Sequence, residues 1–454
     1  MLPDILNLPE YRVLQVDDSG PDYHIRAETI TPPTACNHCG ATSLVGYGHR
    51  EQLIHDLPSH GKRVGISVDT RRYRCKDCRK TFYEPLPAVD EKRRMTTRLV
   101  NWLGEHSARK TFAQLAEETG VSNMTVKAVF VDHSAKLGAA LKIETPQFMG
   151  INEIHLIRRP RVVFTNTKGC LVIEMLDNRD KKSVVRYLSG LSDRERIRCV
   201  TIDMWRPYRD AVREVLPDAG VVVDKFHVLK MANAALDQMR KSVGAAMTSR
   251  QRRTLMKDRK LLLMRPKDLR PEAALMLSGW LRNLPELEAA YNVKEAFYAL
   301  YDAETKEEAL HLQEQWENSL APEMKTAYQP LITAFHNWRD EILAYFDWRL
   351  TNACAESANN LIRVANRMGR GYSFEVLRAK ILFTRGTHKK TMQRPKFRRE
   401  SLGTTAFYHM GMALPLESDE DQTEINYGVD LRLLAEALDT GGNDAIHKSP
   451  RDLG

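Results

Sequence analysis

The sequence lacks any long apolar run. No stretch approaches the roughly 18 to 20 consecutive apolar residues that a membrane-spanning helix needs, and the opening MLPDILNLPEYR has neither the basic nor the apolar segment of a signal peptide. Internal repeats are absent, and no low-complexity tract precedes the acidic C-terminal stretch. With 454 residues, 43% hydrophobic and 28% charged, the chain can bury more than one core. We therefore expect a folded protein that does not associate with membranes.

Negative charge is scarce over most of the chain. Lys and Arg exceed Asp and Glu by 68 to 59, a net charge of +9. Residues 412–454 hold ten acidic and three basic residues, so residues 1–411 carry +16. This surplus favours a polyanionic partner, because cations that neutralise phosphates release condensed counterions. A basic surface that serves only solubility is the alternative.

Cysteines are few, and four of the seven form two CxxC pairs. Cys36 and Cys39 are separated by 35 residues from Cys75 and Cys78. Each CxxC turn can offer two thiolates to one tetrahedral Zn²⁺, so the four predict a closed structural zinc site. A redox pair or a disulfide are the alternatives. The other three, Cys170, Cys199 and Cys354, lie in strand or helix patterns and are expected to be small core residues.

Apolar periodicity predicts a multidomain α+β protein. Along the chain, strand-like alternation comes first and helical spacing second. Three hairpin strands follow, then alternating strands and helices, and then a long helical stretch without strands. The predicted division is a β-rich zinc-binding module at 1–88, a helical region at 89–145, a mixed α/β domain at 146–239 and 346–400, an all-helical insertion at 240–345, and an acidic tail at 401–454.

The segment TFAQLAEETGVSNMTVKAVF has the form of a helix-turn-helix. Gly120 suits a left-handed turn, Val121 can pack between the helices, and Ser122 can cap the second one. In such motifs the start of the second helix enters the major groove of DNA. The predicted DNA contacts are Ser122, Asn123, Thr125 and Lys127. An ordinary helical hairpin is the alternative.

Three acidic residues occupy positions typical of active sites. Asp203 ends a predicted strand, where the active sites of α/β proteins collect. Glu356 lies on a predicted helix whose spacing of four, four and three aligns Asn352, Glu356, Asn360 and Arg363 on one face. Asp224 ends the next strand, where a helix cap is at least as plausible as a catalytic role.

The chain resembles insertion-sequence transposases of the DDE class, in particular the ISL3 family, over roughly residues 30–400. The matching segments are the CxxC pairs, GINEI at 150–154, TIDMWRPYRDAVREVLPDA at 201–219, VVVDKFHVLK at 221–230 and AESANNLIRVANRMGRGY at 355–372. The resemblance implies a ribonuclease-H-like catalytic domain interrupted by a helical insertion. Its acidic triad maps to position 152, Asp203 and Glu356.

Position 152 departs from the family, because Asn152 stands where the family has an aspartate. Two Mg²⁺ or Mn²⁺ ions about 4 Å apart are held chiefly by carboxylates in such sites, and an amide offers an NH₂ donor where an acceptor is needed. Glu153 cannot readily replace the missing carboxylate, because successive side chains on a strand point to opposite faces. We therefore expect DNA binding with poor or no cleavage. Either an aspartate was deliberately changed or activity was lost naturally; the close match elsewhere favours the first.

The resemblance implies binding of double-stranded DNA, both terminal inverted repeats and target DNA, followed by metal-dependent strand cleavage and transfer. Arg363 and Arg367 are expected to add phosphate contacts. Synapsis of two ends implies a homodimer or larger complex, and the expected location is the cytoplasm, at the nucleoid. A non-catalytic DNA-binding protein or repressor derived from a transposase is the alternative, and a nuclease acting on RNA is a further one.

Overall fold

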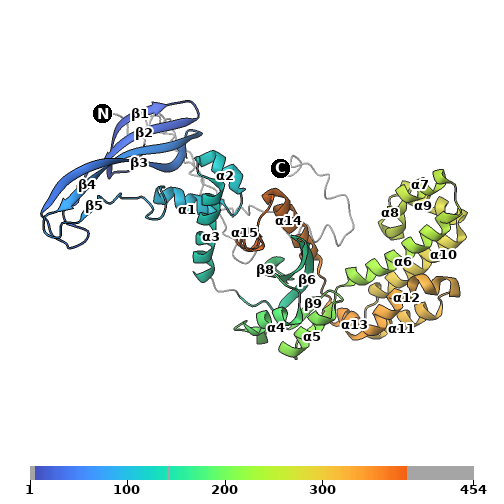
Figure 1. Cartoon of the computed structure of the whole chain (residues 1–454). Helices are drawn as coiled ribbons and strands as arrows, with labels where there is room; N and C mark the ends of the chain where they lie inside the picture. Colours follow the sequence, from blue (N-terminus) through green and yellow to red (C-terminus); the bar gives the residue numbers. More distant parts are fainter. Residues whose placement is uncertain (1–5, 141–143, 386–454) are drawn as a thin grey trace, which may run out of the picture. The chain divides into compact units, whose positions relative to one another are not determined.

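The computed structural model describes residues 6–140 and 144–385 (Figure 1). These residues divide into two compact units, one of residues 6–140 with 365–384 and the other of residues 144–364. In the described part of the chain, no helix is long and apolar enough to cross a membrane. The acidic tail predicted at 401–454 lies outside the described residues.

The first unit begins with a five-stranded sheet in the order β1-β2-β4-β3, with β5 paired to β4. Alternating burial on β2 and on most of β4 turns one face inward, where Ile25, Ile66 and Val68 form the core. The remaining stretch of β3 and β4 extends towards the cysteine turns. The strands are β1 Tyr11–Asp18, β2 Asp22–Thr29, β3 Leu44–Ser59, β4 Lys62–Cys75 and β5 Thr81–Tyr83.

Helices complete the first unit. Three helices follow the sheet directly in the sequence, and a fourth, α15, comes after residue 370. The helices are α1 Thr97–His106, α2 Phe112–Thr119, α3 Asn123–Ala140 and α15 Phe374–Arg385. Val376 of α15 joins the apolar core of the other three. The buried Lys380 donates hydrogen bonds to the carbonyls of Ser107 and Lys110, and its ammonium lies 4.6 Å from the ring centre of Phe112. These contacts fix α15 against the helical region.

The second unit contains a mixed sheet in the order β10-β9-β6-β7-β8. β6, β7 and β8 pair antiparallel, β9 pairs parallel with β6, and β10 pairs parallel with β9, which makes the sheet mixed, as periodicity predicted. Nearly continuous burial marks this sheet as covered on both faces. The strands are β6 Phe148–Leu156, β7 Arg159–Asn166, β8 Leu171–Leu176, β9 Cys199–Ile202 and β10 Gly220–Val223.

Helices cover the sheet, and a long helical region lies between β10 and α14. The helices near the sheet are α4 Lys181–Ser189, α5 Arg206–Val215 and α14 Ala353–Gly369. The helical region contains α6 Lys225–Ala245, α7 Ser249–Lys257, α8 Arg259–Leu263, α9 Pro271–Asn283, α10 Pro285–Ala299, α11 Lys306–Asn318, α12 Pro322–Asn337 and α13 Arg339–Trp348. Short 3₁₀ turns occur at Arg194–Arg196, Pro266–Asp268 and Leu300–Asp302. One apolar core runs through the sheet and this helical region. The multidomain α+β class is thus confirmed.

A disulfide joins Cys170, in the turn between β7 and β8, to Cys354, in the first turn of α14. Their Cα atoms are 5.1 Å apart, although 184 residues separate them in the sequence. Both cysteines are buried in a small apolar cluster, as expected, but the sequence did not predict that they pair with each other. Cys199 is buried and unpaired, as expected.

Candidate active site and metal centre

Asn152, Asp203 and Glu356 line one pocket of about 660 Å³ in the second unit. They come from three elements: β6, the end of β9 and the first turn of α14. Parallel pairing of β6 with β9 aligns Ile151 with Ile202, so the two strands deliver positions 152 and 203 side by side. Glu153, Lys230, Asn360 and Arg363 line the same pocket, which therefore combines three carboxylates with two cations.

The pleat of β6 decides which side chains face α14. A Cβ atom built on Gly150 would lie 2.5 Å from Asn352 Oδ1, so this side of the strand closely approaches the segment leading into α14. Asn152, two residues on, shares that side. Ile151 joins the main apolar core, and Glu153 pairs with Arg179. Glu153 nevertheless lines the same pocket, contrary to the expectation that its side chain would face away, and its carboxylate is already paired with Arg179 there.

Asp203 is held with one oxygen tied and the other without a hydrogen bond. Its Oδ2 accepts the backbone N–H of Glu153 at 3.0 Å, and its buried Oδ1 has no hydrogen-bond partner. Burial raises the pKa of Asp203 to about 6, while the positive charge of His227 opposes the rise and the carboxylate of Asp224 adds to it. A carboxylate oxygen without a hydrogen bond, on a residue that lines a pocket, is a suitable ligand for a cation.

His227 lies between two carboxylates. Its Nδ1 is 3.4 Å from Asp203 Oδ1 and 3.3 Å from Asp224 Oδ2. Burial alone would lower the pKa of His227, but the hydrogen bond to Asp224 and the charge of Asp203 outweigh it and raise the pKa. Sequence analysis assigned His227 no role. The spacing of three residues between Asp224 and His227 in the segment DKFH is the signal that links the two.

Asp224 caps a helix other than its own. It precedes α6 but makes no side-chain capping bond there; its Oδ1 accepts the backbone N–H of Asn352 at 3.0 Å instead, just before α14 begins. Capping was one of the two predicted roles, and the helix concerned is α14.

The polar face predicted on α14 divides in two. Glu356, Asn360 and Arg363 line the pocket, whereas Asn352 is fully buried against Thr201 and Gly150. Burial raises the pKa of Glu356, with Asp224 adding to the rise. The Nδ2 of Asn359, which sequence reasoning did not single out, donates to the carbonyl of Glu153 and so joins α14 to β6. Arg367 is exposed and does not line this pocket.

Trp205 borders the same pocket and is 38% exposed. The guanidinium of Arg179 lies 4.4 Å from its ring centre, and Arg179 also pairs with Glu153. One side of the ring is therefore already covered by a cation that is anchored to β6.

The predicted helix-turn-helix residues occupy the turn and the start of α3. Gly120 adopts φ 72° and ψ 6°, which is left-handed, and Val121 is buried in the core of the three helices. Ser122 Oγ accepts the backbone N–H of Thr125 at 3.2 Å and so caps α3. Asn123 begins α3, and Lys127 follows one turn later.

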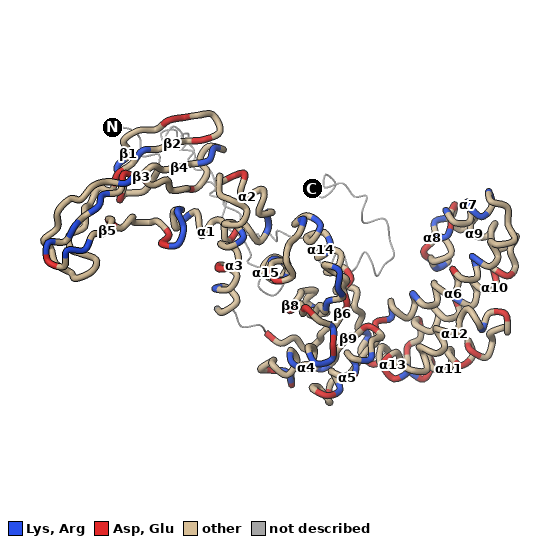
Figure 2. Tube along the Cα trace, in the orientation of Figure 1, with Lys and Arg blue, Asp and Glu red and all other residues tan. Residues whose placement is uncertain are grey.

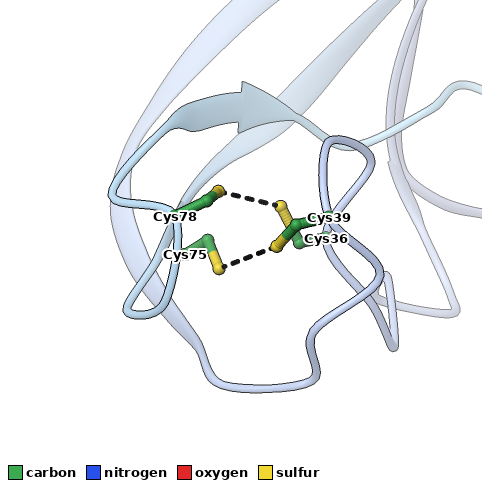
Figure 3. Close-up of side chains that lie close together, drawn as sticks. All are labelled: Cys36, Cys39, Cys75 and Cys78. Atoms are coloured by element: carbon green, nitrogen blue, oxygen red, sulfur yellow. Dashed lines mark hydrogen bonds between the residues drawn. The ribbon is translucent and has the colours of Figure 1, made fainter.

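The four cysteines form one cluster (Figure 3). Their Sγ atoms all lie within 4.8 Å of one another, with 3.7 Å between Cys36 and Cys78 and between Cys39 and Cys75. Matching turns present the two pairs: Cys36 N–H donates to the Ala41 carbonyl, and Cys75 N–H donates to that of Lys80. Four thiols from two such turns have the chemistry and spacing of a structural zinc site.

Family models match three successive parts of the chain. A model described as transposase, of the DDE type and ISL3 family, covers residues 149–381, about half of the chain. The chain belongs to the ISL3 transposase family. Models described as the zinc finger of transposase IS204/IS1001/IS1096/IS1165 and as the helix-turn-helix domain of transposase family ISL3 match residues 32–78 and 84–134.

One relative of this ISL3 transposase-family member is the transposase for insertion sequence element IS1001 of Bordetella parapertussis. The two are 25% identical over 378 residues, which cover 80% of this chain and 91% of the relative. The expected membership of the ISL3 family is thus confirmed, and the zinc-finger match and the thiol cluster together support a structural zinc.

Proposed function

We propose that this chain is a transposase that binds the terminal inverted repeats of an insertion sequence and was built to cut and join DNA strands with divalent metal ions. The observation that carries the proposal is the pocket that gathers position 152, Asp203 and Glu356 beside Lys230 and Arg363. Carboxylates to hold cations, next to cations that contact phosphate, are the combination that phosphodiester chemistry needs.

The residues present fit Mg²⁺ or Mn²⁺ only in part. Asp203, through the Oδ1 that has no hydrogen bond and lies 3.4 Å from His227 Nδ1, and Glu356 would hold the ions, which would activate an attacking water or 3′-hydroxyl and stabilise the leaving oxygen. Asn152 supplies a neutral amide at the third position, so one negative charge is missing. Burial raises the pKa of Asp203 and of Glu356, which disfavours their charged forms, and each lost carboxylate weakens the attraction for a divalent ion.

The chain's own groups position the substrate and the two carboxylates. Arg363 and Lys230 would neutralise the phosphate that enters the pocket, and Asn359 and Asp224 hold α14 so that Glu356 faces Asp203. We accordingly propose that this chain binds transposon ends but cleaves them poorly or not at all.

The proposed domain roles follow the order of the chain. The zinc module at 1–88 and the helix-turn-helix region at 89–145, through Ser122, Asn123, Thr125 and Lys127, would recognise the ends. Of the predicted catalytic domain at 146–239 and 346–400, the second unit would supply 146–239 and 346–364, with the insertion at 240–345 between them, because residues 365–384 pack in the first unit. Arg367 would add a phosphate contact. Holding two ends and a target together requires at least a homodimer, acting in the cytoplasm at the nucleoid.

Asn152 itself favours a second candidate, a transposase-derived DNA-binding protein or repressor without catalysis. Cleavage by the wild-type chain and by Asn152→Asp, on duplexes carrying the inverted repeats that flank the gene, separates the two. Cleavage restored by the aspartate in Mg²⁺ or Mn²⁺, and abolished again by adding Asp203→Asn, supports the transposase. Specific binding by both chains with cleavage by neither supports the repressor.

A further inference from the structure

One face of the outer β3–β4–β5 sheet carries alternating arginine and tyrosine side chains. In the sheet register Arg72 lies opposite Tyr83, and Arg74 lies opposite Val45. Because successive side chains alternate, Tyr73, Cys75 and Phe82 point to the other face, where they pack around the cysteine cluster. The residues that form this arginine–tyrosine face are Tyr47, Arg50, Arg72, Arg74 and Tyr83.

Each guanidinium of the face rests on an aromatic ring. Arg72 lies 5.4 Å from the ring centre of Tyr47 and 5.6 Å from that of Tyr83. The guanidinium of Arg74 also lies 5.8 Å from the ring centre of Tyr47, and the guanidinium of Arg50 lies 5.3 Å from the ring centre of Tyr83. Stacking on the rings orders these otherwise flexible side chains. Binding a partner therefore costs less side-chain conformational entropy.

The charges of the face are not neutralised within the described chain. Arg71, which neighbours the face in sequence but points the other way, pairs with the buried Glu84 and donates to Thr29. Arg50, Arg72 and Arg74 form no ion pair with any described residue; Arg50 and Arg72 contact only the neutral Gln52 and Thr81 in hydrogen bonds. Figure 2 shows several Lys and Arg positions along β3 and β4.

Exposure adds to the case for a partner. Tyr47 is 51% exposed and Tyr83 is 36% exposed, and neither ring belongs to the apolar clusters of this unit, so both stay accessible to a partner. A surface of ordered, uncompensated guanidiniums favours phosphate, because the planar fork binds two phosphate oxygens at once. The ring faces are already covered by guanidiniums, which leaves them poorly placed to stack on unpaired bases.

We propose that the arginine–tyrosine face binds the phosphate backbone of duplex DNA. The inference rests on the DNA-binding function proposed above and adds a contact that carries no sequence information. Base reading belongs to the start of α3, while this face contributes affinity and fixes register on the duplex. The zinc cluster on the opposite side of the same strands would hold the face rigid.

The test is a salt titration with the full-length, zinc-loaded protein. Binding to a duplex with the inverted repeat and to a scrambled duplex is measured from 50 to 300 mM NaCl, for the wild type and for the triple variant Arg50→Gln, Arg72→Gln, Arg74→Gln. Three lost phosphate contacts should lower the slope of log K against log salt by about 2.5 to 3. The triple variant should bind both duplexes about 10- to 100-fold more weakly at 150 mM salt. The ratio of its two binding constants, inverted-repeat over scrambled duplex, should equal that of the wild type.

Matched variants separate charge from folding. Arg26→Gln removes one exposed charge on β2 of the same unit, where Arg26 forms no ion pair with a residue of 6–140 or 144–385, and should lower the slope by far less than any single substitution on the face. Tyr47→Phe with Tyr83→Phe keeps the rings and should bind like the wild type, whereas Tyr47→Ala with Tyr83→Ala should weaken binding. Zinc content and the melting temperature establish that each variant is folded.

The outcomes are distinct. A folded triple variant with an unchanged slope overturns the arginine–tyrosine face while leaving the proposed function intact. Loss of the ratio between the two duplexes, or tighter binding of single-stranded DNA or RNA than of duplex, also overturns it, because the face would then read bases. A wild-type chain that binds neither duplex overturns the proposed function itself.

Discussion

The carboxylate of Asp224 accepts the backbone N–H of Asn352 at 3.0 Å, although the two are 128 positions apart in the sequence. This bond joins the end of β10 to the residue before α14, and the helices α6 to α13 occupy the chain in between. The position of Glu356, one turn into α14, therefore depends on a bond made by a residue on the far side of the helical region.

Removing the acceptor at Asp224 should loosen the start of α14. We expect Asp224→Ala to lose about 1 to 3 kcal/mol of unfolding free energy, because a fully buried N–H is left unpaired. Asp224→Asn retains an oxygen that can accept the bond and should lose less. Chemical denaturation of both variants measures the difference. Equal losses would show that the charge beside His227, and not this hydrogen bond, stabilises the region.

Asp203 should destabilise the metal-free protein at neutral pH. Its pKa is about 6 in the folded chain, above the ordinary value of 3.8, so the folded state binds the proton more tightly than the unfolded state. The free energy of unfolding therefore falls as pH rises from about 4 to 6, by up to about 3 kcal/mol for a shift of roughly two pH units. We expect Asp203→Asn to raise the melting temperature at pH 7.5 and to have a smaller effect at pH 4.

The control for Asp203 is Asp210→Asn, which changes an exposed carboxylate on α5 and should show no such pH dependence. Scanning calorimetry in metal-free buffer at the two pH values provides the measurement. A lower melting temperature for Asp203→Asn at pH 7.5 would mean that hydrogen bonding to Glu153 outweighs the cost of burying the charge.

Zinc removal should abolish DNA binding through loss of structure. The cysteine turns contain a small apolar cluster around Phe82 that cannot maintain its fold alone, so we expect one zinc per chain and collapse of this part on chelation. Cys75→Ser should reproduce the effect, whereas Cys199→Ala, at a cysteine outside the cluster, should not. A colorimetric chelator measures the zinc released, and a gel shift measures DNA binding. Adding zinc back should restore binding, whereas adding magnesium should not. Full binding by the zinc-free protein would contradict it.

The Cys170–Cys354 disulfide should be detectable by peptide mapping. Proteolysis without reductant should yield one linked peptide pair, which separates on reduction, and no link should involve Cys199. Because the bond closes a long loop and anchors the first turn of α14, replacing both cysteines with alanine should lower the melting temperature. Two free thiols in protein isolated with thiol-blocking reagent would refute the linkage.

Short-range features were predictable, and long-range partners were not. Gly120 and Ser122 define their turn through backbone conformation and capping within a few residues, and two-residue periodicity predicts β6 to β8. An aspartate before a helix indicates a local cap, so nothing in the sequence told which helix Asp224 caps. Likewise Cys170 and Cys354 meet only because the β7–β8 turn and α14 pack together. The catalytic and DNA-contacting roles stay predictions.

Asn359 illustrates why the candidate site was only partly predictable. Helical spacing selected Glu356, Asn360 and Arg363, which all line the pocket. Asn359, three residues after Glu356, lines the same pocket, and its amide donates to the backbone of β6, a contact that depends on how closely helix and sheet approach. Periodicity reports which side of a helix is polar but not which neighbouring backbone a side chain will reach.

The membership of α15 in the first unit has a practical consequence. Lys380 and Val376 complete the core beneath the helix-turn-helix, although more than 200 residues separate them from α3. A gene fragment that stops after residue 140 would expose that apolar surface and leave the carbonyls of Ser107 and Lys110 without their ammonium partner. This DNA-binding half therefore cannot be exchanged between relatives as a simple N-terminal cassette, and recombination that keeps it functional must transfer both segments together.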